Sequence, residues 1–189
     1  MSVERRPIPG YEGYYEADAD GNIWSLGRTV NGTKGPRRLK ERKLKPVMNS
    51  NGYLNVNLCA NGKRRTKSAH RLVGAAFGLI ELSDSKQKID HIDHNPLNNR
   101  LSNLRAATDR QNKAHGGSSL MATNTSGFRG VSWHNASKRW VVYIGVNNKN
   151  LNLGYFTCRI AAALAYDDAA VEHFGEFANL NFDPQKLVA

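Results

Sequence analysis

The sequence has few cysteines and no long apolar run, and each shortage removes a class of protein. Cys59 and Cys158 are far apart and form no Cys-x-x-Cys pair, so neither a disulfide framework nor a cysteine zinc site is expected. Both thiols are expected to be buried. No apolar run approaches the ~20 residues of a spanning helix, and the N-terminus lacks the apolar stretch of a signal peptide. We expect a soluble, intracellular protein.

Acidic residues are also scarce, and the resulting positive charge suggests a partner. The 189 residues include 27 Lys and Arg against 16 Asp and Glu, a formal net charge of +11. Lys and Arg that bind phosphates release counterions, so a nucleic acid is the expected partner. Residues 33–46, "TKGPRRLKERKLKP", are the most basic segment, and Arg37, Arg38 and Lys40 in it are candidate DNA contacts. The alternative is a solvated charged segment without a binding role.

Glycine, serine and basic residues divide the chain into blocks. The stretch "HGGSSLMATNTSG" has almost nothing to bury and is typical of a flexible linker. The basic segment separates an N-terminal piece from a middle piece. The predicted division is 1–50, 51–116, a linker at 117–126, and 127–183.

Local signals predict the main elements of the first two blocks. Asp20-Gly21-Asn22 is a turn signal between two short strands, and Asn61-Gly62 is a strong hairpin signal. Ser68 is a candidate N-cap for a helix at 69–78, which carries one apolar stripe. A short strand at 88–91, a polar loop, the stretch "NLRAAT" and a helix from about Thr108 to His115 should follow.

The stretch "IDHIDHNPLNNRLSNLRAATDRQN" is too polar for a core and is either a solvated loop or a site. Asp90 and Asn112 offer hard oxygen ligands for Mg²⁺ or a similar ion. His91 could then act as a base towards water. Because neighbours on a strand face opposite ways, Asp90 and His91 can serve one phosphate only if the strand end is irregular. Asn103 is placed to tie the loop and hold that bend.

"AHRLVGAAF" followed by this stretch resembles the HNH endonucleases of phage homing type, over roughly residues 53–115. The resemblance implies a ββα-metal fold. It also implies that His91 is the general base, that Asn103 organises the loop, and that Asn112 and Asp90 bind the metal. Other branches of that family have His where this chain has Asn112, and Asn favours a hard ion over Zn²⁺. His115 is an alternative ligand.

The C-terminal block predicts three strands joined by "NASK" and "NNKN", then a helix that Thr157 caps and Gly175 ends. Alternation should place Trp140, Val142 and Ile144 on an inner face, with Leu151 and Leu153 joining them. "FRGV", "LGYF", "AAALAYDDAA" and "LNF" resemble the plant APETALA and ethylene-response-factor DNA-binding domain, which implies major-groove recognition by the sheet. The candidate DNA contacts of this block are Arg129, Lys138, Arg139, Tyr143, Asn150 and Asn152.

The predicted fold class is therefore α+β: a small N-terminal β module, a central ββα-metal HNH nuclease core, and a C-terminal three-stranded antiparallel sheet packed on one helix. The predicted function is sequence-directed cleavage of double-stranded DNA by a homing endonuclease of a phage or other mobile element. It would use Mg²⁺ (or Mn²⁺) and act as a monomer or weak dimer in the cytoplasm of a bacterial host cell. The alternatives are a non-catalytic DNA-binding transcriptional regulator and an RNA-binding protein.

The N-terminal "PIPGYEGYYEADADGNIWSL" is similar to a short motif often found ahead of HNH nucleases of mobile elements. Because that motif accompanies DNA nucleases, the resemblance implies that this segment contacts DNA. A small β appendage that supports the nuclease is the alternative.

Overall fold

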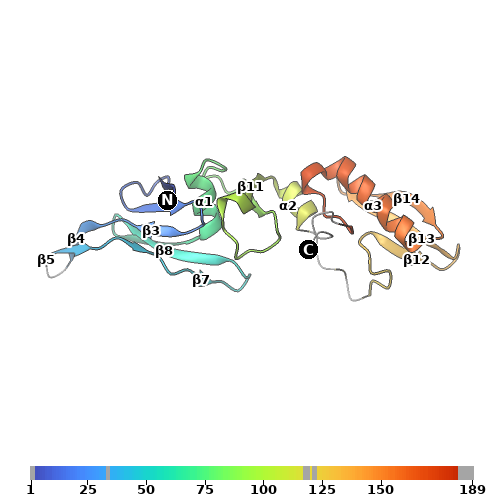
Figure 1. The fold of residues 1–189 in the computed structure, drawn as a ribbon, viewed down its shortest axis with the longest axis horizontal. Helices are drawn as coiled ribbons and strands as arrows, with labels where there is room; N and C mark the ends of the chain where they lie inside the picture. Colours follow the sequence, from blue (N-terminus) through green and yellow to red (C-terminus); the bar gives the residue numbers. More distant parts are fainter. Residues whose placement is uncertain (1–2, 33–34, 117–119, 121–122, 183–189) are drawn as a thin grey trace. The chain divides into compact units, whose positions relative to one another are not determined.

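The computed structural model describes residues 3–32, 35–116, 120 and 123–182. The chain divides into two compact units, residues 1–109 and 110–189 (Figure 1). Within the described ranges, no helix is long and apolar enough to cross a membrane.

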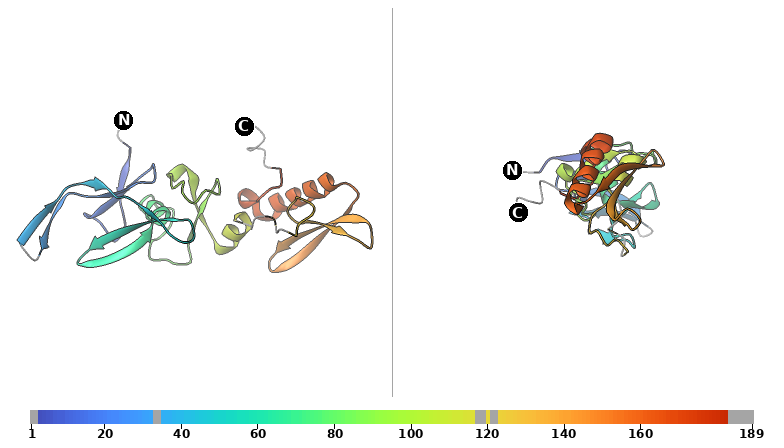
Figure 2. Two further views of the ribbon diagram at one scale, coloured as in Figure 1. Left: turned by 90° about the horizontal axis from the view of Figure 1, so that it is seen from below. Right: turned by 90° about the vertical axis from the view of Figure 1, so that its right-hand side faces the viewer.

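Small antiparallel sheets dominate the first unit. The hairpin of β4 and β5 extends away from the rest of this unit (Figure 2). The sheets are β1-β2-β3-β6 (Arg5–Pro7, Tyr15–Asp18, Ile23–Ser25, Arg42–Lys43), β4-β5 (Arg28–Gly32, Gly35–Leu39), β7-β8-β9 (Val47–Met48, Leu54–Ala60, Lys63–Ser68) and β10-β11 (Lys88–His91, Leu104–Ala107). The helices that accompany or follow them are α1 (Ala69–Ala76), the 3-10 turn η1 (Leu101–Asn103) and α2 (Asp109–His115).

The two turns predicted from short polar signals are present. Asp20-Gly21-Asn22 lies between β2 and β3, and Asn61-Gly62 joins β8 to β9. Helix α1 begins after Ser68, as predicted, but the Ser68 side chain makes no capping hydrogen bond. The helix ends at Ala76, two residues before the expected 78.

One apolar core joins the N-terminal residues to the middle of the chain. Ile8, Tyr15 and Ile23 from the N-terminal part are buried in the same cluster as Leu58 and Leu72. The sequence suggested a separation at the basic segment 33–46, whereas that segment contains β5 and β6, and β6 pairs with β3. Exposed strands tolerate charge, because their outward side chains remain in water.

The second unit is a three-stranded antiparallel sheet with a helix along one face. The sheet order is β12-β13-β14 (Val131–His134, Arg139–Val146, Lys149–Phe156), and α3 (Arg159–Phe174) packs on it and is followed by the turn η2 (Gly175–Phe177). The inner face matches the prediction, because Trp140, Val142 and Ile144 all pack in the cores formed with the small residues of α3. Leu153 joins them, but Leu151 is 37% exposed.

Two further predictions were wrong. The N-cap of α3 is Cys158 and not Thr157, although Gly175 does end the helix. Both cysteines are exposed and not buried. Cys59 follows the buried Leu58 on β8, so the pleat turns the thiol to the open face, and Cys158 precedes the first turn of α3.

Candidate active site

The paired strands β10 and β11 carry the first candidate ligand. Their register sets Asp90 opposite Arg105, and residues directly opposite in a sheet share a face. Arg105 Nε donates to Asp90 Oδ2 at 2.8 Å, and the two side chains are only 14% and 6% exposed. Arg105 was not among the site residues predicted from the sequence. Pairing "KIDH" with "LRAA" in register would have placed it there.

His91 is buried at the end of β10, with 6% of its surface exposed. Its Nε2 lies 3.0 Å from the Oδ1 atom of Asn99, which is 5% exposed. The ring of His70 lies edge-on to the His91 ring, with 5.2 Å between centroids, and the ring of Tyr53 lies 6.0 Å away. Three side chains therefore lie against the His91 ring, and none of them was expected there from the sequence.

His70 is buried in its neutral form beside His91. Burial, assisted by the charges of His91 and Arg71, lowers the pKa of His70 from 6.5 to about 3. Its Nδ1 atom is buried and has no hydrogen-bond partner. His70 therefore brings no positive charge to this cluster at neutral pH.

Asn103 ties the polar loop between the strands through both ends of its amide. Its Nδ2 donates to Asp93 Oδ1 and to the carbonyl of Asn98, each at 2.8 Å, and its Oδ1 accepts from the Asp93 N–H at 3.0 Å. Burial alone would raise the pKa of Asp93, but the hydrogen bonds from Asn98, the Asn95 N–H and Asn103 bring it below its usual range. The loop hydrogen bonds expected of Asn103 are present, and its catalytic role stays a prediction.

The irregular strand end predicted at Asp90 and His91 is not seen in the strand pairing, and the chain turns only after His91. Pairing with β11 remains regular through His91, which is opposite Leu104. The chain then turns, with His94 N–H donating to the His91 carbonyl at 2.9 Å and His94 at a φ of 59°. His91 is therefore both the last strand residue and the first residue of a turn.

The remaining predicted ligand lies in α2, which follows β11 in the chain. Asn112 is half-buried in that helix, which belongs largely to the second unit, and His115 at its end is buried. Across the described residues, no group of three or more His, Cys, Asp or Glu side chains could hold a metal ion. Coordination by Asp90 and Asn112 stays a prediction.

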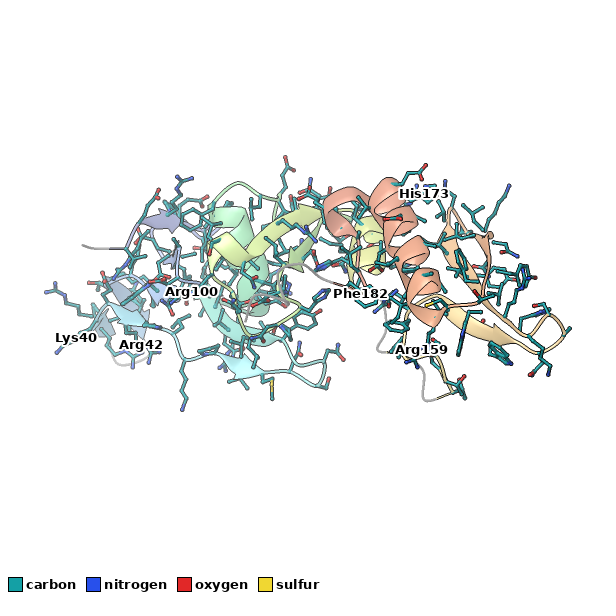
Figure 3. All side chains as sticks on the ribbon, turned by 45° about the vertical axis from the view of Figure 1, so that its right-hand side comes forward. Lys40, Arg42, Arg100, Arg159, His173 and Phe182 are labelled. Carbon is teal, nitrogen blue, oxygen red and sulfur yellow. The ribbon has the colours of Figure 1, made fainter. Side chains whose placement is uncertain are left out.

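The basic residues predicted to contact DNA in the first unit are exposed. Arg37 and Arg38 lie on β5, and Lys40 follows it. Together with Arg42 and Arg64, Arg37 and Lys40 line a groove bounded by the β4–β5 hairpin and β8. Lys40 and Arg42 lie beside that hairpin in Figure 3.

In the second unit most of the predicted DNA contacts are on the surface. Tyr143 is opposite Asn152 across the sheet, and the other exposed candidates are Lys138, Arg139 and Asn150. Arg129 is half-buried, and its backbone N–H donates to Asn181 Oδ1 at 2.6 Å.

A family model matches the part of the chain that contains the candidate site residues. Residues 67–114 match the HNH endonuclease family. Residues 4–59 match the NUMOD4 motif. The HNH segment includes Asp90, His91, Asn99, Asn103 and Asn112.

Individual relatives match shares of different size of the chain. The DNA endonuclease I-HmuI of Bacillus phage SP01 is 33% identical over 110 residues, which are 58% of this chain and 55% of that protein. A solved structure of DNA binding and cleavage by the HNH homing endonuclease I-HmuI aligns with a TM-score of 0.45 and 31% identity, over 58% of this chain and 55% of that one. The AP2-like ethylene-responsive transcription factor At1g16060 of Arabidopsis thaliana is 43% identical over 68 residues, which are 35% of this chain and 20% of the factor. The chain thus spans about half the length of the phage relative and a smaller part of the plant factor.

Proposed function

We propose that this protein is a DNA endonuclease of the homing type, which hydrolyses a phosphodiester of double-stranded DNA. The observation that carries the proposal is the buried, oriented His91 next to Asp90, within the HNH segment. The net charge of +11 supports a polyanionic substrate. The phage relative supports an origin in a phage or other mobile element, and hence action in the cytoplasm of a bacterial host cell.

His91 acts as the general base in this proposal. Its imidazole takes a proton from a water molecule aligned with the scissile phosphorus. Asn103 keeps the loop closed behind His91 through its bonds to Asp93 and Asn98. Asp90 and Asn112 are the proposed ligands of one divalent cation, which when bound neutralises charge on the leaving oxygen.

The donor chemistry fits a hard cation. Asp90 and Asn112 supply oxygen atoms, and Mg²⁺ is usually held by one or two carboxylates with several waters. Zinc sites usually take three or four His, Cys or carboxylate ligands, whereas the proposed donors are one carboxylate and one amide oxygen. Mg²⁺ or Mn²⁺ is therefore the proposed ion.

The basic surfaces bind the DNA in this proposal. Arg37, Arg38 and Lys40 contact the phosphate backbone in this proposal. The outer face of the β12–β14 sheet enters a major groove, where amides such as those of Asn150 and Asn152 can pair with adenine. The protein acts as a monomer or weak dimer, with one nuclease site in each chain.

Cleavage of a supercoiled plasmid library with random inserts tests the proposal. With Mg²⁺, wild-type protein should produce nicked or linear DNA with common sequences at the cut ends. His91→Ala should lower the cleavage rate by about 10²–10⁴-fold, the usual contribution of a general base. Its affinity for DNA, measured by fluorescence anisotropy, should be unchanged.

Two results would contradict this proposal. Cleavage by His91→Ala at the wild-type rate would remove His91 as the base. Tight binding by the wild-type protein without cleavage in Mg²⁺ or Mn²⁺ would favour a DNA-binding regulator.

A further inference from the structure

Asn99 is a buried amide whose side-chain oxygen faces the His91 ring. It is 5% exposed, and its Oδ1 lies 3.0 Å from His91 Nε2. A carbonyl oxygen only accepts, so Nε2 must carry the hydrogen in this pair. In a neutral imidazole the lone pair is then on Nδ1, and Nδ1 becomes the basic atom.

The N-terminal turn packs directly on the backbone of Asn99. Gly21 has a φ of +88°, and a Cβ at that position would lie 2.5 Å from the Asn99 carbonyl oxygen and 2.6 Å from its carbon. Beside this contact, the Leu101 N–H donates to the Ala19 carbonyl at 2.9 Å. The turn at residues 19–22 thus supports the segment that carries Asn99.

The turn is itself anchored in the core of the unit. Asp18 is 2% exposed and accepts from the Asn22 N–H at 2.8 Å, the Asn22 Nδ2 at 2.9 Å and the Trp24 Nε1 at 2.7 Å. Ala17 and Ile23, on either side of the turn, are also buried. The turn therefore has little freedom to follow a displaced Asn99.

We propose that Asn99 is a positioning residue that fixes the tautomer and direction of His91, and that the N-terminal turn at Gly21 fixes Asn99. This inference rests on the proposed function, because the benefit is a base whose Nδ1 atom is aimed before DNA binds. It gives the residues matched by the NUMOD4 motif a part in the chemistry that is separate from any contact with DNA. A supporting residue behind a functional histidine is worth about 10–100-fold where it has been measured at metal sites.

Two substitutions at Asn99 test the first step. Asn99→Leu removes the acceptor at similar volume, and Asn99→Asp retains an acceptor oxygen. Asn99→Leu should lower kcat by about 10–100-fold. Its KM for a plasmid that carries the preferred cut sequence should be unchanged. Asn99→Asp should retain most of the rate. Leu97→Ala is the control in the same loop, because the Leu97 side chain is 48% exposed and does not contact the His91 ring.

Nitrogen NMR of His91 separates this inference from the proposed function, because it needs no cleavage. The wild-type signals should show Nε2–H and an unprotonated Nδ1, and Asn99→Leu should show a mixture of tautomers. A wild-type His91 that carries its hydrogen on Nδ1 would overturn the inference, even if the protein cuts DNA. Absence of cleavage with the Nε2–H form present would overturn the proposed function alone.

Gly21→Ala tests the second step, and Gly10→Ala is its matched control. Gly10 has a similar φ of +77°, so an alanine there carries similar backbone strain. An added Cβ at Gly10 has no atom within 4 Å, whereas the added Cβ at Gly21 collides with the Asn99 backbone. Gly21→Ala should lower kcat and mix the His91 tautomers as Asn99→Leu does, whereas Gly10→Ala should do neither. Equal behaviour of the two glycine variants would overturn the role of the turn.

Asn22→Ala tests the role of the turn if Gly21→Ala does not fold. It removes the Asn22 Nδ2 bond to Asp18 without adding an atom to the turn. We expect a smaller fall in kcat, with KM unchanged and the same mixing of tautomers. An unaltered tautomer signal and rate in this variant would count against the turn.

Discussion

His70 is a buried imidazole whose neutral form the fold selects, so it makes the stability of the first unit depend on pH. Burial and the nearby charges of His91 and Arg71 lower its pKa from 6.5 to about 3. Between these two pH values the unfolded chain binds a proton at His70 that the folded chain does not bind. The free energy of unfolding therefore rises with pH in this window, and stability is lost as pH falls below 6.5.

Replacing His70 with Phe should flatten this dependence. Phe retains an aromatic ring against Tyr53 and His91 but takes up no proton. Between pH 7 and pH 5, wild type should lose up to about 2 kcal/mol more than His70→Phe, at about 1.4 kcal/mol per pH unit. The free energies of unfolding of both proteins are measured at each pH by urea unfolding, which is monitored through NMR signals of core residues in the first unit. Parallel loss in both proteins would show that other groups control the pH response.

At the residue scale, the sequence predicts the polar groups of the candidate site better than it predicts their partners. Asp90, His91 and Asn103 can be recognised from the sequence, because clustered polar residues are unfavourable in a core unless they form hydrogen bonds or a functional site. Their contacts to Arg105, Asn99 and His70 depend on strand register and on the packing of α1. Asn99, His70 and Tyr53 are distant from His91 in the chain and meet its ring only in the folded state.

Turns are the elements that the sequence predicts most directly. Asp20-Gly21-Asn22 and Asn61-Gly62 are read from local backbone chemistry, and both occur where expected. The start of α3 was displaced by one residue, since Cys158 caps without using its side chain. The strands β5 and β6 escaped prediction because their residues are mostly basic and exposed, without an alternating apolar face.

A second pair of glycines tests close packing in the C-terminal unit. Gly130, with a φ of +72°, precedes β12, and an added Cβ would lie 2.6 Å from the Tyr143 carbonyl oxygen and against the Tyr166 ring. Gly127 has a φ of +76° and no such neighbour. Gly130→Ala should therefore destabilise the unit by about 1–3 kcal/mol more than Gly127→Ala, because it adds overpacking to the shared backbone strain.

Urea unfolding of each variant, followed by NMR signals of β13, gives the two free energies. The Tyr143 N–H donates to the Gly130 carbonyl at 2.9 Å, and its signal should shift in Gly130→Ala only. Equal free energies of unfolding for the two variants would mean that Tyr143 and Tyr166 move to accommodate the added methyl group at Gly130 with little loss of stability.

At the scale of the whole molecule, the two family matches fall almost entirely in the first of the two compact units. The NUMOD4 and HNH matches fall in the first unit, apart from the last residues of the HNH segment, and they share one apolar core. The plant-factor match covers 68 residues, and the described second unit is the sheet and helix that the sequence predicted. Under the proposed function, a DNA-recognising sheet joined to a nuclease unit would allow target choice and cleavage chemistry to change independently.

That separation predicts a variant that cuts but no longer selects. Tyr143, Asn150 and Asn152 are exposed on the outer face of the sheet, so replacing all three with Ala should leave the fold intact. If this face reads bases, each lost pair reduces discrimination by about 1–3 kcal/mol, and the cut ends from the plasmid library should lose their common sequence. The Mg²⁺-dependent rate on non-preferred DNA should stay at the wild-type level, because the proposed base His91 and the proposed ligands Asp90 and Asn112 are unchanged. Leu164→Ala with Val171→Ala is the control, since both residues are exposed on α3 and uncharged. Retention of the wild-type cut sites by the triple variant would show that the sheet face does not select the target.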